Sequence, residues 1–583
     1  MRKIIVLLSL FLMLNFVVDV YALEENLIIK EHLDKSMEKI IAENKAKGAI
    51  AVLIQNGEVI LNKGYGYADE FLGTSADGCK TGFRIGSISK TFVAVAALTA
   101  FQDGKLDMNK DISLYLESDF PKLKYPVTMH HLLTHTAGFE ETITGIAVKN
   151  VSQTEPLSIT VKKYMPKQIT KPGSIASYSN YGIALAAYVI EKATGIDFAE
   201  YCMNRIFIPL DMRKTTFAYM HNKVVVSKAY LPNGEETIEP YINLYPEGSA
   251  VSTAEDMGKY IKWLLDENDY ILFKDNKDKL FSRQYYMAEE LGGIGYVWNR
   301  KIRNNHIYFD KKGETLNFYS RIVLYPGNCS GLFISFNTFV PEREINEITA
   351  DITDILLGKK SVNALKDGAD IEIDGCYANM WSSFKTAEKL LRFFIPMKMV
   401  EINGSPTDGY TFNGEKMVHI GNNTYDTPIG TVKFLEENSK LMMATDFSQT
   451  YVKISGLENK PVTLSICILF LISTLIFLVM TLVYCFKKKG SLVLLVITSG
   501  IQLLSFLGIG LMIFNGIMQY AVLSYVPYIN ICVWLIAAST VIHLLNIVLG
   551  TLKNRKTCIT KYLYFHVVIS IAFCLVLFNL NMF

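Results

Sequence analysis

The stretch from Phe83 to Phe92, FRIGSISKTF, decides the fold and carries a serine and a lysine three residues apart. The apolar, alanine-rich run from Phe92 to Gln102 predicts a buried helix, so Ser87 and Lys90 lie on one face of its first turn. A serine hydroxyl needs a nearby base to act as a nucleophile, and a buried lysine amine can be that base. The start of a helix also offers N–H groups to a developing oxyanion.

Two further motifs follow in the chain. Tyr178 and Asn180, in the stretch SYSNYG, offer a phenol that can move a proton and an amide that can hold a substrate. Lys311 and Gly313, in the stretch DKKGE, offer a cation for an anionic group and an open backbone at a strand edge. Each motif by itself is more often an ordinary polar turn.

Together the three motifs resemble the SxxK, Y-x-N and K-x-G set of the serine β-lactamase and penicillin-binding-protein superfamily. Residues 131–138 (HLLTHTAG) and 246–257 (PEGSAVSTAEDM) are similar to the signatures HLLTHTSG and PAGGLVSTAxDM of one branch. That branch holds class C β-lactamases, D-Ala-D-Ala carboxypeptidases, D-aminopeptidases and esterases. The resemblance covers about residues 28–358 and implies an α/β fold, with an antiparallel sheet flanked by helices and an all-α lobe.

The resemblance also implies a role for each residue of the site. Ser87 is expected to attack the substrate carbonyl, Lys90 to activate it, and Tyr178 to pass the proton to the leaving group. The expected binding residues are Asn180 for the acyl side chain and Lys311 with Gly313 for the substrate carboxylate, with the backbone N–H groups of Ser87 and Glu314 as the oxyanion hole. No metal or organic cofactor is implied.

Two residues complicate this assignment. Glu314 follows the third motif where many members of the branch have glycine, and it is expected to put a carboxylate beside the oxyanion position. That leaves the substrate class open. His135 suggests a Ser-His-Asp triad, but the resembling family does not use this histidine as a base, and we interpret it as structural.

Both ends of the chain are apolar. A basic start, an apolar core and Val20-Tyr21-Ala22 predict a signal peptide over residues 1–22. After Pro461, four apolar stretches predict membrane-spanning helices, at about 463–486, 491–517, 529–551 and 562–581 of the region 463–583.

Basic residues lie in two of the loops between these stretches, at 487–489 and 553–561, and the loop 518–528 has no Lys or Arg. The positive-inside rule therefore predicts a multi-pass cell-membrane protein whose domain at 25–358 is extracytoplasmic. The spans contain few polar residues. Gln502, His543 and Asn546 have no acidic neighbour there, so we expect them to form hydrogen bonds between helices rather than to line a transport path.

Residues 365–458 form a separate unit with short alternating runs broken by Asn-Gly and Asp-Gly turns. The pattern predicts a small β-barrel or β-sandwich, with a helix at Phe384 to Phe394, and accessory domains of this kind follow the hydrolase in some relatives. A role as a spacer and a role in substrate binding both remain open, and we favour the spacer.

The net charge is only +2, without a basic stripe, which argues against nucleic-acid binding. The sequence therefore predicts a membrane-anchored serine hydrolase that acts on D-amino-acid peptides of the cell wall, or on related amides or esters. One alternative is a β-lactamase, and another is a sensor or immunity protein that binds penicillin or a wall precursor. Protein partners and the disulfide status of the scattered cysteines stay open.

Overall fold

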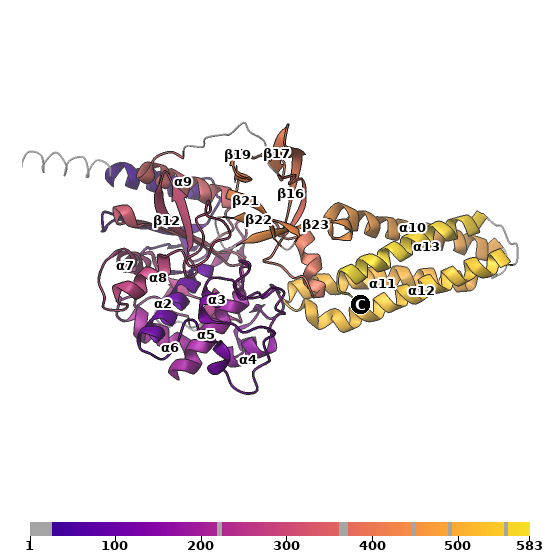
Figure 1. Cartoon of the computed structure of the whole chain (residues 1–583), viewed down its shortest axis with the longest axis horizontal. Coiled ribbons are helices and arrows are strands. Elements are labelled where there is room, and N and C mark those ends of the chain that lie inside the picture. Colours follow the sequence, from indigo (N-terminus) through magenta and orange to yellow (C-terminus); the bar gives the residue numbers. More distant parts are fainter. Residues whose placement is uncertain are drawn as a thin grey trace, which may run out of the picture.

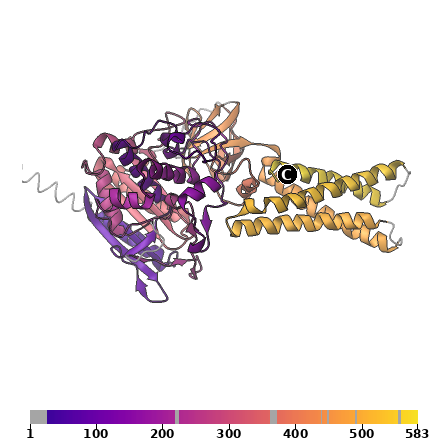
Figure 2. The ribbon, with the colours of Figure 1, turned by 90° about the horizontal axis from the view of Figure 1, so that it is seen from below.

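The structure is a computed structural model with a globular body at one end and a rod of four helices at the other (Figures 1 and 2). It describes residues 26–217, 224–360, 371–437, 439–445, 449–487, 492–552 and 558–582. The signal peptide predicted at 1–22 lies outside the described residues, as do the central residues of both basic loops.

The first sheet of the body is antiparallel and is closed by the two ends of the region 28–358. Its order is β11-β12-β13-β14-β1-β2-β3, and β1 pairs with β14 so that Ala49 lies opposite Phe336. The strands are β1 (Gly48–Gln55), β2 (Glu58–Asp69), β3 (Thr74–Ser75), β11 (Asn299–Arg303), β12 (His306–Glu314), β13 (Tyr319–Tyr325) and β14 (Ser330–Phe336). This arrangement confirms the predicted antiparallel sheet.

Both faces of this sheet are covered, which explains why β1 is buried along its whole length. Side chains alternate between the faces of a strand. Ala49, Ala51 and Leu53 pack against the helix at residues 26–42 and against α9 (Glu342–Leu357). The intervening residues, Ile50, Val52 and Ile54, join the larger core on the other face.

That larger core is shared with the helical lobe, whose central helices are α2 and α5. Helix α2 (Ser89–Gln102) begins two residues after Ser87, which the sequence predicts in its first turn, and is buried on every side except at its last two residues. Helix α5 (Asn180–Thr194) packs against it. The smaller helices are α3 (Met129–Leu133), α4 (Leu157–Lys163), α6 (Phe198–Cys202), α7 (Ala254–Leu265) and α8 (Lys274–Phe281).

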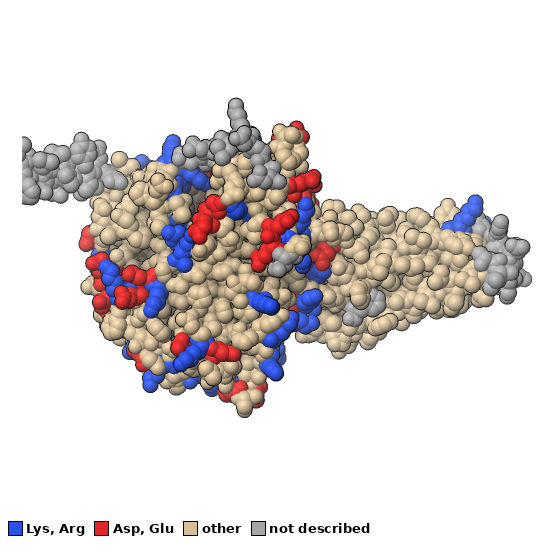
Figure 3. Space-filling model, in the orientation of Figure 1, with Lys and Arg blue, Asp and Glu red and all other residues tan. Residues whose placement is uncertain are grey.

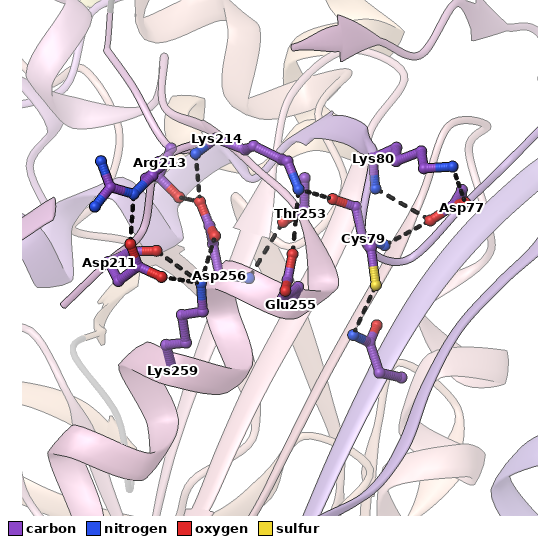
Figure 4. A network of polar contacts seen from close by, with 12 residues as sticks. Asp77, Cys79, Lys80, Asp211, Arg213, Lys214, Thr253, Glu255, Asp256 and Lys259 are labelled. Carbon is purple, nitrogen blue, oxygen red and sulfur yellow. Dashed lines mark hydrogen bonds and ion pairs between the residues drawn. The ribbon is translucent and has the colours of Figure 1, made fainter. Parts of the chain in front are cut away.

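A short strand, β4 (Thr81–Arg84), leads directly into the Ser87 turn and pairs with β10 (Val251–Ser252). The start of α7 beside β10 is fixed by the polar network of Figure 4. The Asp256 carboxylate accepts from the backbone N of Lys214 at 2.7 Å, and Lys214 Nζ donates to the carbonyl of Cys79 at 2.6 Å. The strand before Ser87 is therefore held at both ends.

The accessory region is a single nine-stranded antiparallel sheet in the order β18-β17-β16-β15-β23-β22-β21-β20-β19. One apolar cluster collects side chains from nearly every strand, so the sheet curves around one core, as in a small barrel. The strands are β15 (Gly375–Asn379), β16 (Met399–Ser405), β17 (Gly409–Phe412), β18 (Glu415–Lys416), β19 (Val418–Gly421), β20 (Thr424–Thr427), β21 (Gly430–Glu437), β22 (Lys440–Thr445) and β23 (Thr450–Ile454). The helix predicted near residue 384 is instead a 3-10 helix, η7 (Ala387–Phe393).

The rod consists of α10 (Lys460–Lys487), α11 (Val493–Met518), α12 (Val526–Leu552) and α13 (Cys558–Asn579), and each is long and apolar enough to cross a membrane. The turn between α11 and α12, which includes η9 (Val522–Tyr525), contacts the body.

Buried polar side chains join the helices of the rod. Gln502 donates to Thr540 at 3.0 Å, and Thr498 shares a hydrogen bond with His543 at 2.7 Å. These bonds confirm the interhelical interpretation for Gln502 and His543. Asn546, by contrast, donates to the carbonyl of Ile542 in its own helix.

Breaking a buried ion pair between β12 and β13 is expected to destabilise the fold. Arg321 on β13 donates twice to Asp310 on β12, at 2.9 and 2.7 Å. Burial disfavours the Asp310 carboxylate, but Arg321 and Lys301 outweigh this effect and hold its pKa below the usual value. Replacing Arg321 with Met leaves this charge without its main partner, so we expect a loss of about 3 kcal/mol, measured as a lower thermal midpoint of the full chain. The exposed Arg343→Met variant is the control and should keep its midpoint.

Candidate active site

Ser87 and Lys90 meet at the start of α2. Ser87 lies in the one-turn 3-10 helix η1 (Gly86–Ile88), and Lys90 lies in the first turn of α2. Lys90 Nζ donates to Ser87 Oγ at 2.8 Å. Lys90 is completely buried, whereas Ser87 keeps part of its surface exposed. The three-residue spacing therefore brings the accessible Ser87 hydroxyl into hydrogen-bond contact with the buried Lys90 ammonium.

Tyr178 brings a second proton donor to the same oxygen. It lies just before α5, where Ser179 caps the helix by accepting from the backbone N of Gly182. Its phenol donates to Ser87 Oγ at 2.8 Å. Burial raises the pKa of Tyr178, although the Lys90 charge opposes this effect, so the phenol is neutral at rest.

Glu247 is a functional residue that the sequence reasoning missed. It lies at the end of η5 (Tyr245–Glu247) and is buried. Its Oε2 atom and its backbone carbonyl accept from Lys90 Nζ at 2.7 and 2.6 Å. Burial works against the ammonium, but the charge of Glu247 and the hydrogen bond to it outweigh burial and raise the pKa of Lys90. The available signal was the stretch PEGS, where the related signature PAGG has alanine in place of glutamate.

Lys311 reaches the site from β12, and its Nζ lies 4.8 Å from the centre of the Tyr178 ring. Lys90 Nζ lies 5.1 Å from the same ring. Burial, and then repulsion from Lys90, lowers the pKa of Lys311 well below its ordinary value. The site therefore combines one paired ammonium with one amine that loses its proton easily.

The end of β12 touches the Ser87 turn through backbone alone. Gly86 has a left-handed φ of +52°, and a Cβ at this position would lie 2.5 Å from the backbone N of Glu314. A Cβ on Gly313 would lie 2.0 Å from the carbonyl oxygen of Ile85. Only glycine permits this approach, which brings the backbone N of Glu314 next to the residue that precedes Ser87.

The Glu314 side chain does not lie where the sequence suggested. Successive side chains on a strand point to opposite faces, so Glu314 lies with Lys312 on the face away from Lys311 and Gly313. There it lines a small cavity beside Glu342. The expectation of a carboxylate beside the oxyanion position is therefore wrong.

Asn180 is fixed by a buried carboxylate. Its Nδ2 and backbone N donate to Glu141 at 2.7 and 3.2 Å. Its Oδ1 is buried and has no hydrogen-bond partner among the described residues. Burial raises the pKa of Glu141 to about 7, against the opposing charge of Lys398. Asn180 thus keeps an acceptor free for a ligand.

The accessory domain also forms part of the site. Trp381 packs edge-on against the Tyr178 ring, with 5.2 Å between ring centres. Lys398 Nζ lies 3.3 Å from the centre of the Trp381 ring, and burial lowers the pKa of this lysine to about 7. Next to Tyr178, Ser177 Oγ donates to the carbonyl of Met380 at 3.0 Å. A spacer role does not account for these contacts, and no local pattern in the sequence indicates them.

His135 supports Tyr178 and makes no hydrogen bond with Ser87 among the described contacts. Its ring lies 4.4 Å from the Tyr178 ring, and its Nδ1 accepts from the backbone N of Ser179 at 3.3 Å. Burial, with Lys311 and Lys90 nearby, lowers the pKa of His135 well below its usual value. Among the described residues, no three His, Cys, Asp or Glu side chains are grouped to hold a metal ion.

Comparison with known proteins places this site in a family. The family model described as Beta-lactamase matches residues 33–356. The chain is 28% identical over 280 residues to "Putative penicillin-binding protein PbpX" of Bacillus subtilis, covering 46% of this chain and 68% of that protein. It is 28% identical over 320 residues to "Protein flp" of Staphylococcus aureus, covering 53% of this chain and 63% of that protein.

Comparison with solved structures gives matches at low sequence identity. The crystal structure of SurE with D-Leu is 16% identical with a TM-score of 0.52, and the match covers 73% of this chain and 100% of that one. Beta-Lactamase/D-Alanine Carboxypeptidase from Pseudomonas syringae is 19% identical with a TM-score of 0.49, covering 56% and 99%. Since the family model spans more than half of the sequence, the chain belongs to the beta-lactamase family.

Proposed function

We propose that this protein is a membrane-anchored serine hydrolase that cleaves D-amino-acid peptides of the cell wall, or related amides or esters, through an ester on Ser87. The observation that carries the proposal is the contact of one oxygen with two proton-handling groups. Ser87 Oγ lies 2.8 Å from both Lys90 Nζ and the Tyr178 hydroxyl. The 28% identical relative named as a penicillin-binding protein supports this substrate class.

Acylation begins from the Lys90–Glu247 ion pair. Glu247 Oε2 takes a proton from Lys90, and the resulting amine takes the proton of Ser87 as Oγ bonds to the substrate carbonyl carbon. The exchange is feasible at 2.7 Å, and it leaves a neutral acid beside the lysine instead of a new buried charge. The oxyanion that forms is held by the backbone N–H groups of Ser87 and Glu314.

Tyr178 completes the transfer. Its phenol gives its proton to the leaving nitrogen as the C–N bond breaks, and it takes a replacement proton from Lys90. The acid form of Glu247 then returns its proton to Lys90. In deacylation, Glu247 again takes a proton from Lys90, and the Lys90 amine takes the phenol proton of Tyr178 as Tyr178 takes a proton from the attacking water. When the ester bond breaks, Lys90 gives a proton to Ser87 Oγ, and Glu247 returns its proton to Lys90.

Two residues hold the substrate in this scheme. The free Oδ1 of Asn180 accepts from an N–H group of the acyl side. Lys311 pairs with a substrate carboxylate. Burial lowers the pKa of this lysine, and an incoming anion favours its charged form again, so Lys311 favours anionic substrates.

The proposal includes an orientation in the membrane. The body lies at one end of the rod, and the cations Lys487 and Lys561 belong to the helix ends at the other. Basic residues near helix ends favour the cytoplasmic side, so the body lies outside the cell.

A sensor function is the second candidate because the rod touches the site loop. Leu523 N in the rod donates to Thr144 Oγ1 at 3.0 Å, and the nearby Glu141 fixes Asn180. Retained biological activity in a Ser87→Ala protein favours the sensor over the hydrolase.

The nucleophile is tested by covalent labelling. We expect a fluorescent fluorophosphonate or penicillin to label the full chain and Ser113→Ala, an exposed serine control, but not Ser87→Ala. Mass spectrometry should place the adduct on the peptide that contains Ser87. An adduct on another residue contradicts the proposal, and rapid hydrolysis of nitrocefin identifies a β-lactamase instead.

The glycine contact is tested by adding one methyl group. Gly86→Ala should reduce the labelling rate about 100-fold because its Cβ displaces the Glu314 N–H, one donor of the proposed oxyanion hole. Gly104→Ala is the matched control, since Gly104 has a similar φ of +68° with no atom within 4 Å of the added Cβ. Equal labelling rates for the two variants rule out the role of this contact.

The proton relay is tested by the pH profile of Glu247→Gln. Losing this carboxylate lowers the pKa of Lys90, so the free amine forms only as pH rises through the new, lower pKa. At neutral pH we expect labelling about 100-fold slower than in the wild type, with recovery at alkaline pH. Glu255→Gln, at an ion pair outside the site, should follow the wild type. A wild-type profile for Glu247→Gln excludes the relay.

A further inference from the structure

A cavity of about 510 Å³ lies where the hydrolase domain, the accessory domain and the helical rod meet. Its size is within the usual range of ligand sites. One side is polar and includes Lys167, Lys385 and Asn581, and the other side is apolar. The apolar wall is formed by Leu523, Val526 and Phe578.

The cavity lies at the ends of the rod helices that are next to the body. Val526 is the first residue of α12, and Phe578 is the second-last residue of α13. Leu523 belongs to η9, the turn that joins α11 to α12 next to the body. If the four helices cross the membrane as proposed, the apolar wall faces the acyl chains and the polar side faces the headgroups.

The two lysines at the cavity are available to a ligand. Both are exposed, and no carboxylate among the described residues lies within ion-pair distance of either ammonium. Glu140 lies close by: its Oε2 accepts from the backbone N of Phe384 and Lys385 at 2.7 Å, and its Oε1 has no hydrogen-bond partner among the described residues. Figure 3 shows blue Lys and Arg side chains on the part of the body that lies beside the rod. The visible surface of the rod itself carries almost no charged side chains.

Hydrogen bonds also join the hydrolase domain, the accessory domain and the rod next to this cavity. Lys167 Nζ donates to the carbonyl of Lys385 at 3.3 Å, which links the hydrolase domain to the accessory domain beside the cavity. The buried Lys389 donates to the carbonyl of Asn579 at 3.0 Å and pairs with Glu458. The polar and apolar walls therefore keep a fixed relation, as a ligand with a charged head and an apolar tail requires.

We propose that this cavity binds an anionic phospholipid of the outer leaflet, with its phosphate on Lys167 and Lys385 and its acyl chains along Val526 and Phe578. Lysine is a common phosphate ligand, and each lysine near a membrane surface strengthens binding of an anionic lipid by about fivefold. The proposal rests on the membrane insertion of the rod and not on the chemistry at Ser87. It also gives α12 and α13 a purpose, since a single anchoring helix cannot build this wall.

The test compares lipid retention in the full chain. Wild-type protein is reconstituted in nanodiscs of phosphatidylglycerol and phosphatidylcholine and then extracted in detergent. Native mass spectrometry measures the mass of the lipid that stays bound. We expect retained phosphatidylglycerol, with about 25-fold weaker retention in Lys167→Gln/Lys385→Gln. Lys105→Gln/Lys416→Gln, which removes two exposed charges outside the cavity, should retain lipid as the wild type does.

Each outcome separates the lipid site from the other proposals. Equal retention by wild type and the cavity variant contradicts the site, as does equal retention of phosphatidylcholine. If millimolar inorganic phosphate displaces the lipid and its water-soluble headgroup equally well, the result shows a phosphate site in which the acyl chains have no role. An unchanged thermal midpoint shows that the variant is folded, and failure to enter nanodiscs refutes membrane insertion itself.

Discussion

The ammonium group of Lys90 is completely buried, and a buried charge must be paired if the protein is to fold around it. Glu247 supplies the counter-charge and a backbone carbonyl, and Ser87 takes the remaining N–H. This constraint fixes the serine oxygen relative to the lysine. The neighbouring Lys311 loses its proton easily because it is buried and because its charge would repel Lys90 across the Tyr178 ring. Burial and the Lys90–Glu247 ion pair together therefore decide which groups of the site carry charge.

Backbone contact is the second constraint. The strand that carries Lys311 ends against the turn that carries Ser87, and neither Gly86 nor Gly313 leaves room for a Cβ there. The alternation of strand side chains then decides where charge goes: Lys311 faces the site, and Glu314 faces away from it. A residue that departs from the family pattern is thus harmless to the site because of its position on the strand.

The accessory domain and the rod are structurally coupled to the site. Trp381 packs on Tyr178, and the Glu388 carboxylate accepts from the backbone N of Ile143 and Thr144 at 2.6 and 3.0 Å. Thr144 in turn accepts from Leu523 in the rod. Hydrogen bonds therefore run from the membrane end of the body to the loop that holds Asn180, and the cavity with Lys167 and Lys385 opens beside this path.

The sequence by itself determined the pairing of Ser87 with Lys90, the buried helix behind them and the four apolar helices. These features depend on neighbours a few residues apart or on periodicity along one element, which local composition encodes. Only the tertiary structure decided which residues distant in the sequence contact the site. Lys90 and Glu247 are 157 residues apart, and Ser177 and Met380, beside the Tyr178–Trp381 contact, are 203 apart. Such contacts depend on how whole elements pack, and packing depends on shape and burial across the entire chain.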